Sequence, residues 1–296
     1  MVLKVFLSLL VIPMCWQSYF NFDGFLDLNN VQEQKIAPQR IYTEVLDVKI
    51  TAKSAIAVDA QSGKILYTKN SQQIRSIASI TKLMTALIFL DHNPGWQKEI
   101  YTIASDRRNG GIIHLNAGEV LTIRNLFFTA LLASDNDATI ALARSTGLSE
   151  DQFVLEMNKK AKVLGLENTF FIEPSGLNSG NKSTAADIVK LIEIATQQQE
   201  IKKATSTNRY EFEVRGKEKN RTVSLINTDW LTNSYLDVLG GKTGYIEKSG
   251  YCLAVKIENE VNQEIIVVVL GSDSNFDRFQ DVKAISDWVF NNYKWN

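Results

Sequence analysis

Ser79-Ile-Thr-Lys82 opens an almost uninterrupted apolar run, Leu83-Met-Thr-Ala-Leu-Ile-Phe-Leu90. A helix that is apolar on all sides belongs inside a domain, and residues three apart share one face of a helix. The Ser79 hydroxyl and the Lys82 amine can therefore touch. Burial lowers the pKa of a lysine, and a serine beside a neutral amine is an activated nucleophile. The stretch predicts nucleophilic chemistry. A second Ser-x-x-Lys lies at residues 179–182 in a polar loop, so this pattern alone does not identify a catalytic serine.

The composition is that of an ordinary globular protein. The chain has 296 residues, 45% hydrophobic and 22% charged, which allows one large domain or two small ones. A net charge of -1 gives no reason to expect nucleic acid or an acidic membrane surface as a partner. Cys15 and Cys252 do not make a disulfide framework, and Cys252 is predicted to be a small core residue. His92 and His114 have no cysteine cluster for zinc, so they are predicted to be surface or loop residues, and no metal or organic cofactor is expected.

The N-terminus is typical of an exported protein. Residues 1–20 are predicted to be a signal peptide or an N-terminal membrane anchor, because Lys4 precedes roughly ten apolar residues. This run is short for a transmembrane helix, which needs about 20. No A-x-A cleavage site follows, so cleavage stays open. Residues 21–50 are predicted to be a linker, and residues 51–296 a folded domain.

The domain is predicted to have a hairpin at each end and helices between them. Residues 54–60 and 64–68 flank a turn, as do residues 251–257 and 265–270, which is typical of β-hairpins. Helices are predicted over residues 121–132, 138–144 and 149–164, and from a capping-box pattern at 183–187 to about residue 195. The closing helix repeats apolar residues at three- and four-residue intervals: Phe279, Val282, Ile285, Trp288 and Val289. The prediction is an α+β fold, with an antiparallel sheet from both chain ends and a helical subdomain inserted.

Three short motifs occur in order: Ser79-x-x-Lys82, Ser134-Asp135-Asn136 and Lys242-Thr243-Gly244. Each is weak alone, but the trio is the set found in β-lactamases and penicillin-binding proteins. Acyl transfer needs a nucleophile, a base, donors for an oxyanion and a cation for an anionic substrate end. The motifs supply all of these groups, so the chain is predicted to be an acyl-transfer enzyme.

That chemistry gives each motif residue a role. Ser79 is predicted to be the nucleophile, Lys82 its general base and Ser134 a proton relay to the leaving amine. A second lysine nearby would help keep Lys82 neutral by like-charge repulsion. The remaining predicted groups bind substrate: Asn136 the peptide backbone, Lys242 and Thr243 a carboxylate, Gly244 by leaving room for the ligand, and the main-chain N–H groups of Ser79 and Tyr245 the oxyanion.

The chain resembles the serine-type D-Ala-D-Ala carboxypeptidases, the low-molecular-weight penicillin-binding proteins that trim peptidoglycan stem peptides. Beyond the three motifs, the resemblance rests on short blocks at residues 117–119, 133–138, 164–169, 174–177, 183–187 and 241–251. It implies a serine β-lactamase/transpeptidase-like catalytic domain over residues 51–296, removal of D-alanine through an acyl-enzyme on Ser79, and β-lactam antibiotics as acylating inhibitors. It also implies action at the extracytoplasmic face of the bacterial membrane or in the periplasm. In this family an arginine after the last central strand helps bind the terminal carboxylate. Arg278 falls at the matching place, although Asp273 and Asp277 could instead pair with it.

Two departures from the family pattern keep alternatives open. Asp135 is typical of class A β-lactamases, which also carry a deacylating Glu with an Asn four residues later. Here Asn178 follows Glu173 by five residues, so Glu173 is interpreted as an incidental surface acid. The chain ends at Asn296 without the β-rich domain and C-terminal anchor of many members, so any anchoring is expected from the N-terminal segment. The alternatives are a β-lactamase or a DD-endopeptidase on the same fold, and an inactive peptidoglycan-binding relative.

Overall fold

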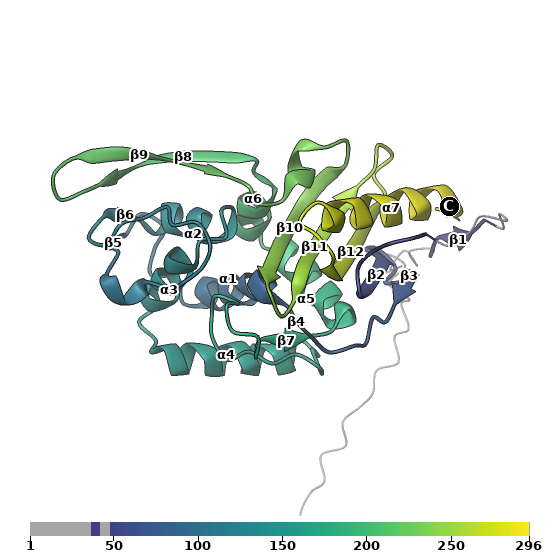
Figure 1. The fold of residues 1–296 in the computed structure, drawn as a ribbon, viewed down its shortest axis with the longest axis horizontal. Coiled ribbons are helices and arrows are strands. Elements are labelled where there is room, and N and C mark those ends of the chain that lie inside the picture. Colours follow the sequence, from purple (N-terminus) through teal and green to yellow (C-terminus); the bar gives the residue numbers. More distant parts are fainter. Residues whose placement is uncertain (1–36, 42–47, 296) are drawn as a thin grey trace, which may run out of the picture. The chain divides into compact units, whose positions relative to one another are not determined.

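A central antiparallel sheet joins the two ends of the domain in the computed structural model, which describes residues 37–41 and 48–295. The predicted segment 1–20 lies outside these residues. The strand order is β10-β11-β12-β2-β3 (Figure 1), and Val268 of β12 lies opposite Ile56 of β2. The predicted fold class is therefore confirmed. The strands are β2 (Ser54–Asp59), β3 (Ile65–Lys69), β10 (Asp237–Ile246), β11 (Gly250–Glu258) and β12 (Glu264–Ser272).

Helices cover both faces of this sheet. Successive side chains of a strand point to opposite faces, and β12 is apolar on both of them. Val267 packs in one core with helix α7 (Asp277–Asn292), whereas Val268 packs in the other core with α5 (Ala185–Gln197). Figure 1 shows α7 lying across β11 and β12. The apolar residues of α7 are core residues as predicted, with Trp288 partly buried and Phe279, Val282, Ile285 and Val289 fully buried.

The helical subdomain is built around helix α1 (Thr81–Asp91), which is buried from Thr81 to Phe89. It contacts α2 (Ile123–Leu131), α3 (Asn136–Ser145), α4 (Glu150–Val163) and α5. The ring of Phe89 lies 5.5 Å from that of Phe127 on α2. The apolar run after Ser79 is thus the buried helix that the sequence predicts.

One predicted helix start and one predicted capping box differ in the structure. Helix α2 begins at Ile123 rather than Leu121, because the Thr122 side chain caps it by accepting from the Asn125 N–H at 3.3 Å. At α5 the Thr184 hydroxyl accepts from the Asp187 N–H at 3.1 Å, as a capping box requires. The Asp187 carboxylate does not return to the cap, since it accepts from the Asn168 N–H and the Thr169 hydroxyl instead. Only half of the predicted capping box is formed.

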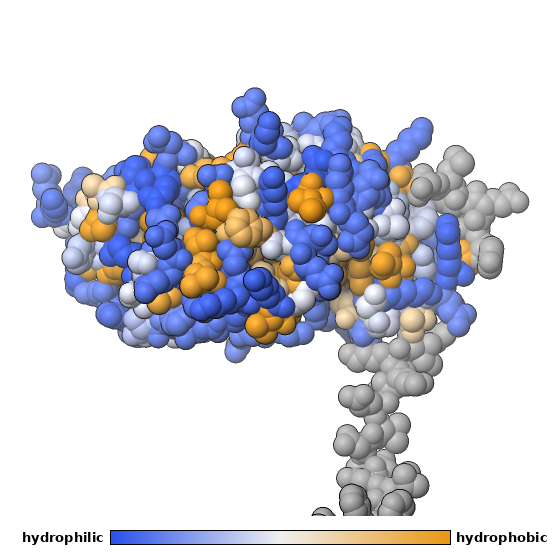
Figure 2. Space-filling view, turned by 90° about the horizontal axis from the view of Figure 1, so that it is seen from below, coloured by the Kyte–Doolittle hydropathy of each residue, from blue (hydrophilic) through white to orange (hydrophobic). Residues whose placement is uncertain are grey.

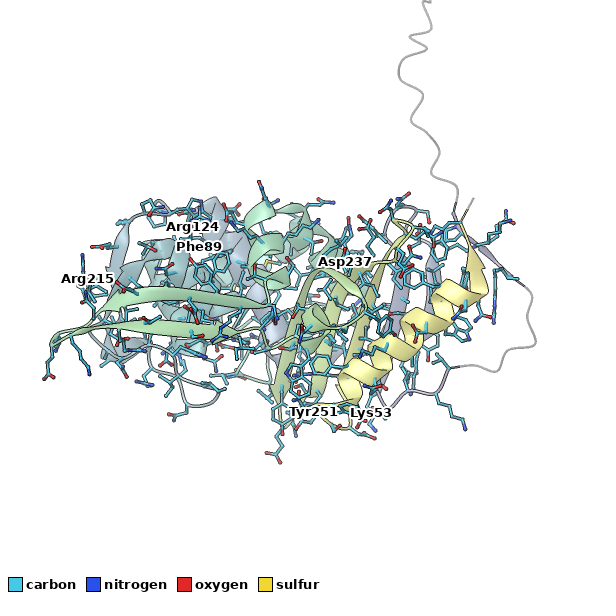
Figure 3. The ribbon with its side chains drawn as sticks, turned by 90° about the horizontal axis from the view of Figure 1, so that it is seen from above. Lys53, Phe89, Arg124, Arg215, Asp237 and Tyr251 are labelled. Carbon is cyan, nitrogen blue, oxygen red and sulfur yellow. The ribbon has the colours of Figure 1, made fainter. Side chains whose placement is uncertain are left out.

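A four-stranded sheet with the order β5-β6-β8-β9 was not predicted from the sequence. Its strands are β5 (Glu99–Tyr101), β6 (Val120–Thr122), β8 (Arg209–Arg215) and β9 (Asn220–Ile226). Phe212 and Val214 of β8 are buried and pack in the core that contains α2. Figure 3 labels Arg215 at the end of β8, where its guanidinium donates to Glu99 of β5.

Short strands join distant parts of the chain. Strand β1 (Gln39–Arg40) falls within the predicted linker 21–50 and pairs with β13 (Tyr293–Lys294). Strand β4 (Arg75–Ser76) pairs with β7 (Lys182–Ser183), beside the turn that carries Ser79. Helix α6 (Gln199–Ser206) follows α5 and contacts β10.

The surface on the α4 side mixes hydrophilic residues with separate hydrophobic ones (Figure 2). The exposed apolar side chains on or just after α4 are Leu155, Val163, Phe170 and Ile172. Apolar residues scattered in this way are ordinary on a folded protein. Within the described ranges, no helix is long and apolar enough to cross a membrane.

Candidate active site

Ser79 lies in a 3-10 turn, Ala78–Ile80, immediately before α1. Ser79 thus precedes the helix in which it was predicted to lie, but the three-residue spacing still brings it to Lys82. The Lys82 Nζ lies 2.9 Å from the Ser79 Oγ. Lys82 is fully buried, whereas Ser79 is partly exposed. A reagent from solvent can therefore reach the hydroxyl and not the amine.

In the described part of the chain, three oxygen atoms lie within hydrogen-bond distance of the Lys82 amine. Besides the Ser79 Oγ, they are the Asn136 Oδ1 at 2.7 Å and the Ser175 carbonyl oxygen at 2.6 Å. The Asn136 Nδ2 donates to the Gly110 carbonyl at 2.9 Å, which fixes the orientation of the amide. Both carbonyl oxygens can only accept, so a neutral amine gives its two hydrogens to them and turns its lone pair toward the Ser79 hydroxyl. The arrangement can take a proton from Ser79.

The charge state of Lys82 is set mainly by burial. Burial lowers the pKa of Lys82 to about 7, and the carboxylates of Glu173 and Asp135 partly oppose this change. Burial and then the charge of Lys82 lower the pKa of Lys242 well below its usual value. The repulsion between the two lysines thus lowers the pKa of Lys242, whereas burial is what lowers the pKa of Lys82.

Strand β10, at the edge of the central sheet, carries the third motif. Lys242 is buried and donates to the Thr243 carbonyl at 3.2 Å, and the Thr243 hydroxyl shares a 2.7 Å hydrogen bond with that of Thr228. A Cβ on Gly244 would lie 2.8 Å from the Ile77 carbonyl oxygen and 3.2 Å from the Ser79 nitrogen. The prediction that Gly244 makes room for a ligand is therefore incomplete, because this glycine lets β10 approach the backbone of the Ser79 turn.

Two stacked tyrosines mark the end of β10 nearest this turn. The rings of Tyr245 and Tyr251 lie 4.2 Å apart between β10 and β11, and Tyr245 is half-exposed. Figure 3 shows Tyr251 and Asp237 at opposite ends of the β10–β11 hairpin. Tyr245 directly follows Gly244, the residue at which β10 approaches the Ser79 turn.

Arg278 lies behind these strands, at the start of α7. It is buried, and its Nη1 donates to the carbonyls of Gly244 at 3.2 Å and Cys252 at 3.5 Å. It forms no ion pair with Asp273, which pairs with Lys53 at 3.1 Å. Asp277 forms no ion pair with Arg278 either, so neither aspartate that the sequence offered pairs with it, and its role in binding a carboxylate stays a prediction.

Asp229 is a buried carboxylate that the sequence analysis missed. Its Oδ1 accepts from the Leu231 N–H at 3.0 Å, while its Oδ2 has no hydrogen-bond partner among the described residues. Burial raises the pKa of Asp229 to about 6, and its charge raises the pKa values of Lys242 and Arg278 against their own burial. Asp229 is the counter-charge of both cations, and no motif marks it in the sequence.

The second motif spans the loop between α2 and α3. Ser134 has a positive φ of 57°, and its hydroxyl has no hydrogen bond within residues 37–41 and 48–295. Asp135 caps α3 through the Ala138 N–H at 2.8 Å and accepts from the His114 N–H at 2.9 Å. The resemblance of Asp135 to class A β-lactamases therefore has a structural cause, because this side chain anchors a helix and a loop. His114 is partly buried against it, at 3.1 Å, rather than simply exposed.

The interpretation of Glu173 as an incidental surface acid is wrong. Its carboxylate accepts from the Ser175 N–H at 2.7 Å and the Gly176 N–H at 2.6 Å, within its own turn. This turn presents the Ser175 carbonyl to Lys82. The contribution of Ser175 was not predicted, because a main-chain acceptor leaves no mark in residue type.

The other candidates take no part in this cluster. The second Ser-x-x-Lys pair is a structural loop, in which the Ser179 carbonyl accepts from the Ser76 hydroxyl at 2.7 Å and Lys182 is exposed in β7. Cys252 is buried and free, as predicted, and His92 is exposed at the end of α1. Cys15 lies outside the described residues.

A family model described as D-alanyl-D-alanine carboxypeptidase matches residues 40–274. The chain belongs to the D-alanyl-D-alanine carboxypeptidase family. It is 35% identical over 249 residues to "D-alanyl-D-alanine carboxypeptidase DacF" of Bacillus subtilis. This match covers 82% of this chain and 63% of the relative. It is 32% identical to a D-alanyl-D-alanine endopeptidase of Pseudomonas aeruginosa, over 82% of this chain and 79% of the relative.

Solved structures show the same fold for this carboxypeptidase family member. The crystal structure of a Streptomyces DD-transpeptidase superposes with a TM-score of 0.77 at 29% identity, covering 83% of this chain and 100% of that chain. The family resemblance inferred from the three motifs is therefore confirmed. The chain spans less than two thirds of the Bacillus relative.

Proposed function

We propose that this chain is a serine D-alanyl-D-alanine carboxypeptidase that removes the terminal D-alanine of peptidoglycan stem peptides. The observation that carries the proposal is the threefold contact of Lys82. Because the Asn136 and Ser175 oxygens take both amine hydrogens, the lone pair of a neutral Lys82 faces the Ser79 hydroxyl. An amine with a pKa of about 7 is neutral often enough near neutral pH to act as a general base.

Acylation begins when the Ser79 Oγ attacks the carbonyl carbon of the D-Ala-D-Ala bond and Lys82 takes the hydroxyl proton. The main-chain N–H groups of Ser79 and Tyr245 hold the oxyanion of the tetrahedral intermediate. Ser134 passes a proton to the departing amine, the C–N bond breaks and free D-alanine leaves. Water then attacks the ester on Ser79 and gives up a proton to Lys82; the ester C–O bond breaks, and that proton passes to the Ser79 oxygen.

Substrate binding uses the cations beside β10. Lys242 and Thr243 hold the terminal carboxylate, and the positive charge of Arg278 behind the strand adds to the attraction. One hydrogen of the Asn136 Nδ2 is committed to Gly110, which leaves the second for the peptide backbone. A bound carboxylate favours the charged form of Lys242 against the burial that lowers its pKa, and an anion beside two cations is attracted strongly once water is excluded.

The position of Glu173 favours a carboxypeptidase over a class A-like β-lactamase. Its carboxylate is occupied by donors of its own turn, so it is poorly placed to activate a deacylating water. A DD-endopeptidase is the second candidate, since the Pseudomonas aeruginosa relative carries that name and matches over most of its length. An inactive peptidoglycan-binding relative would have no need of the Lys82 arrangement.

The proposal extends to where the protein acts. Its substrate lies in the cell wall, so the protein would be exported and work at the extracytoplasmic face of the membrane or in the periplasm. The apolar residues 2–16 would direct export and, if retained, hold the protein at the membrane. Sequencing the N-terminus of the mature protein tests this part.

The test of function compares three substrates with the purified protein. D-Alanine release from a pentapeptide is measured beside cleavage of a crosslinked peptide dimer and turnover of nitrocefin. We expect D-alanine release and a covalent penicillin adduct on Ser79, located by mass spectrometry and absent from Ser79→Ala. Rapid nitrocefin turnover without D-alanine release would establish a β-lactamase instead. Cleavage of the dimer alone would establish an endopeptidase, and no adduct at all would indicate an inactive relative.

A further inference from the structure

We propose that Glu173 is a positioning residue for Lys82, because it holds the turn at residues 173–178 that carries the Ser175 carbonyl. The inference rests on the proposed function, since it concerns the base that activates Ser79. Glu173 lies outside the three motifs, and its carboxylate binds donors of its own loop rather than the Ser79 hydroxyl.

The Glu173 carboxylate is the centre of its turn. Its Oε2 accepts from the N–H and the hydroxyl of Ser175, at 2.7 and 2.6 Å. Its Oε1 accepts from the N–H groups of Gly176 at 2.6 Å and Asn178 at 3.3 Å, and from the Asn181 side chain at 3.1 Å. Hydrogen bonds to an ionised acceptor are stronger than neutral ones. One carboxylate thus joins four residues of the loop, at positions 175, 176, 178 and 181.

Hydrogen bonds connect the 173–178 turn and the adjacent Asn181 to the first residues of helix α1. The Ser175 carbonyl accepts from Lys82 at 2.6 Å, and the Pro174 carbonyl accepts from the Thr85 hydroxyl, also at 2.6 Å. The Asn181 Nδ2 lies 3.1 Å from the Thr81 hydroxyl. Positions 81, 82 and 85 lie within one turn of the helix. A shift of the turn would therefore move the acceptor of Lys82.

The Ser175 carbonyl decides which way the lone pair of Lys82 points. A neutral amine has two hydrogens and one lone pair. With Asn136 and Ser175 both accepting, only the Ser79 hydroxyl is left for the lone pair. If the Ser175 carbonyl moved out of hydrogen-bond distance, Lys82 could donate the freed hydrogen to the Ser79 hydroxyl. Lys82 would then no longer act as the general base for Ser79.

The charge of Glu173 contributes a second, separable effect. The charged groups that face Lys82 are Glu173 from the turn, Asp135 from the α2–α3 loop and Lys242 from β10, with His114 bound to Asp135. Both carboxylates raise the pKa of Lys82 against burial. Removing the charge of Glu173 would lower that pKa below about 7, so the neutral amine would persist to lower pH.

Two substitutions separate geometry from charge. In Glu173→Gln, an amide NH₂ would face at least one donor that now binds an oxygen, so the turn loosens and the charge is lost. In Glu173→Asp, the charge remains but the carboxylate is one methylene shorter. Loss of one charge-assisted hydrogen bond is enough for about a tenfold fall in rate. We expect slower acylation in both variants, and a shifted pH profile only in Glu173→Gln.

The experiment measures the rate of Ser79 acylation by penicillin from pH 5 to 9, using the full chain and mass spectrometry. For Glu173→Gln we expect a rate at least about tenfold lower at the plateau, with the acidic limb moved to lower pH. Glu173→Asp should be slowed with its acidic limb unchanged. Glu167→Gln is the matched control, because Glu167 is exposed and lies six positions earlier, and it should behave as the wild type.

The outcomes separate this inference from the proposed function. A wild-type protein that penicillin does not acylate would refute the proposed function itself. If the wild type is acylated and Glu173→Gln keeps its rate, the positioning role is wrong. A slower Glu173→Gln with an unmoved acidic limb would indicate a merely structural turn and would also overturn the inference. If Glu173→Gln fails to fold, Glu173→Asp decides: acylation of this variant at the wild-type rate would overturn the inference.

Discussion

A methyl group on Gly176 should separate the 173–178 turn from the nucleophile. Gly176 has a φ of +88°, and a Cβ there would lie 2.1 Å from the Ala78 carbonyl oxygen and 2.8 Å from the Ser79 nitrogen. Close carbon–oxygen contacts in proteins are about 3.3 Å or longer. The Gly176→Ala side chain therefore cannot be accommodated unless the turn moves away from Ser79.

Two costs add up in Gly176→Ala. The left-handed backbone costs an alanine about 1–2 kcal/mol, and overpacking costs about 1–3 kcal/mol more. The expected loss in the free energy of unfolding is thus about 2–5 kcal/mol. In a domain of this size each kcal/mol lowers Tm by about 2–4 °C. Because the turn carries the Ser175 carbonyl, the acylation rate should also fall about tenfold for each 1.4 kcal/mol lost from the transition state.

Gly63→Ala is the matched control for the backbone cost. Gly63 has a similar φ of +73°, but its Cβ would meet no atom within 4 Å. Thermal unfolding followed by circular dichroism should show Gly63→Ala losing only the backbone cost, and its penicillin acylation should stay at the wild-type rate. Equal Tm values for the two variants, together with wild-type acylation of Gly176→Ala, would refute the contact between the turn and Ser79.

Two further predictions concern charge. Acylation by penicillin should slow as the pH falls below about 7, because the neutral Lys82 amine is lost as the pH drops through its pKa of about 7; a rate that stays flat between pH 5 and 8 would contradict this. Asp229→Asn removes the charge that raises the pKa values of Lys242 and Arg278, so KM for a D-Ala-D-Ala peptide should rise more than kcat falls. A peptide with an amidated C-terminus is the control, and an equal rise in its KM would show that the carboxylate is not involved.

The contact between Ser79 and Lys82 could be predicted because it depends on local geometry. Residues three apart meet on one face whether the turn is α-helical or 3-10, so the misplaced helix start did not matter. The contact between Asn136 and Lys82 could be predicted as well, because it requires only that the first and second motifs come together in the folded chain. The contribution of Ser175 depends on a backbone carbonyl and on the folding of a distant loop, and neither is visible in residue types.

The missed sheet shows a different limit. Residues 209–215 alternate exposed and buried positions, which is the period of a half-buried strand. Strands β5 and β6 are each only three residues long, too short for a periodic signal, so the partners of β8 were not apparent. Asp229 was missed for another reason. A lone aspartate is usually a surface residue, and only burial beside two cations gives it a role.

The order of the central strands constrains how the chain is made. Strand β12 lies between β2 and β11, so roughly two hundred residues are synthesised between β2 and its partner, a delay of about 10 to 40 seconds at ordinary rates of translation. Until Glu264–Ser272 emerges, β2 exposes an unpaired edge, which other chains can pair with. Ser79 and Lys82 are therefore synthesised long before the central sheet can close. Pairing of β2 with β12, and with it the closed central sheet, follows only after residues 264–272 have been synthesised.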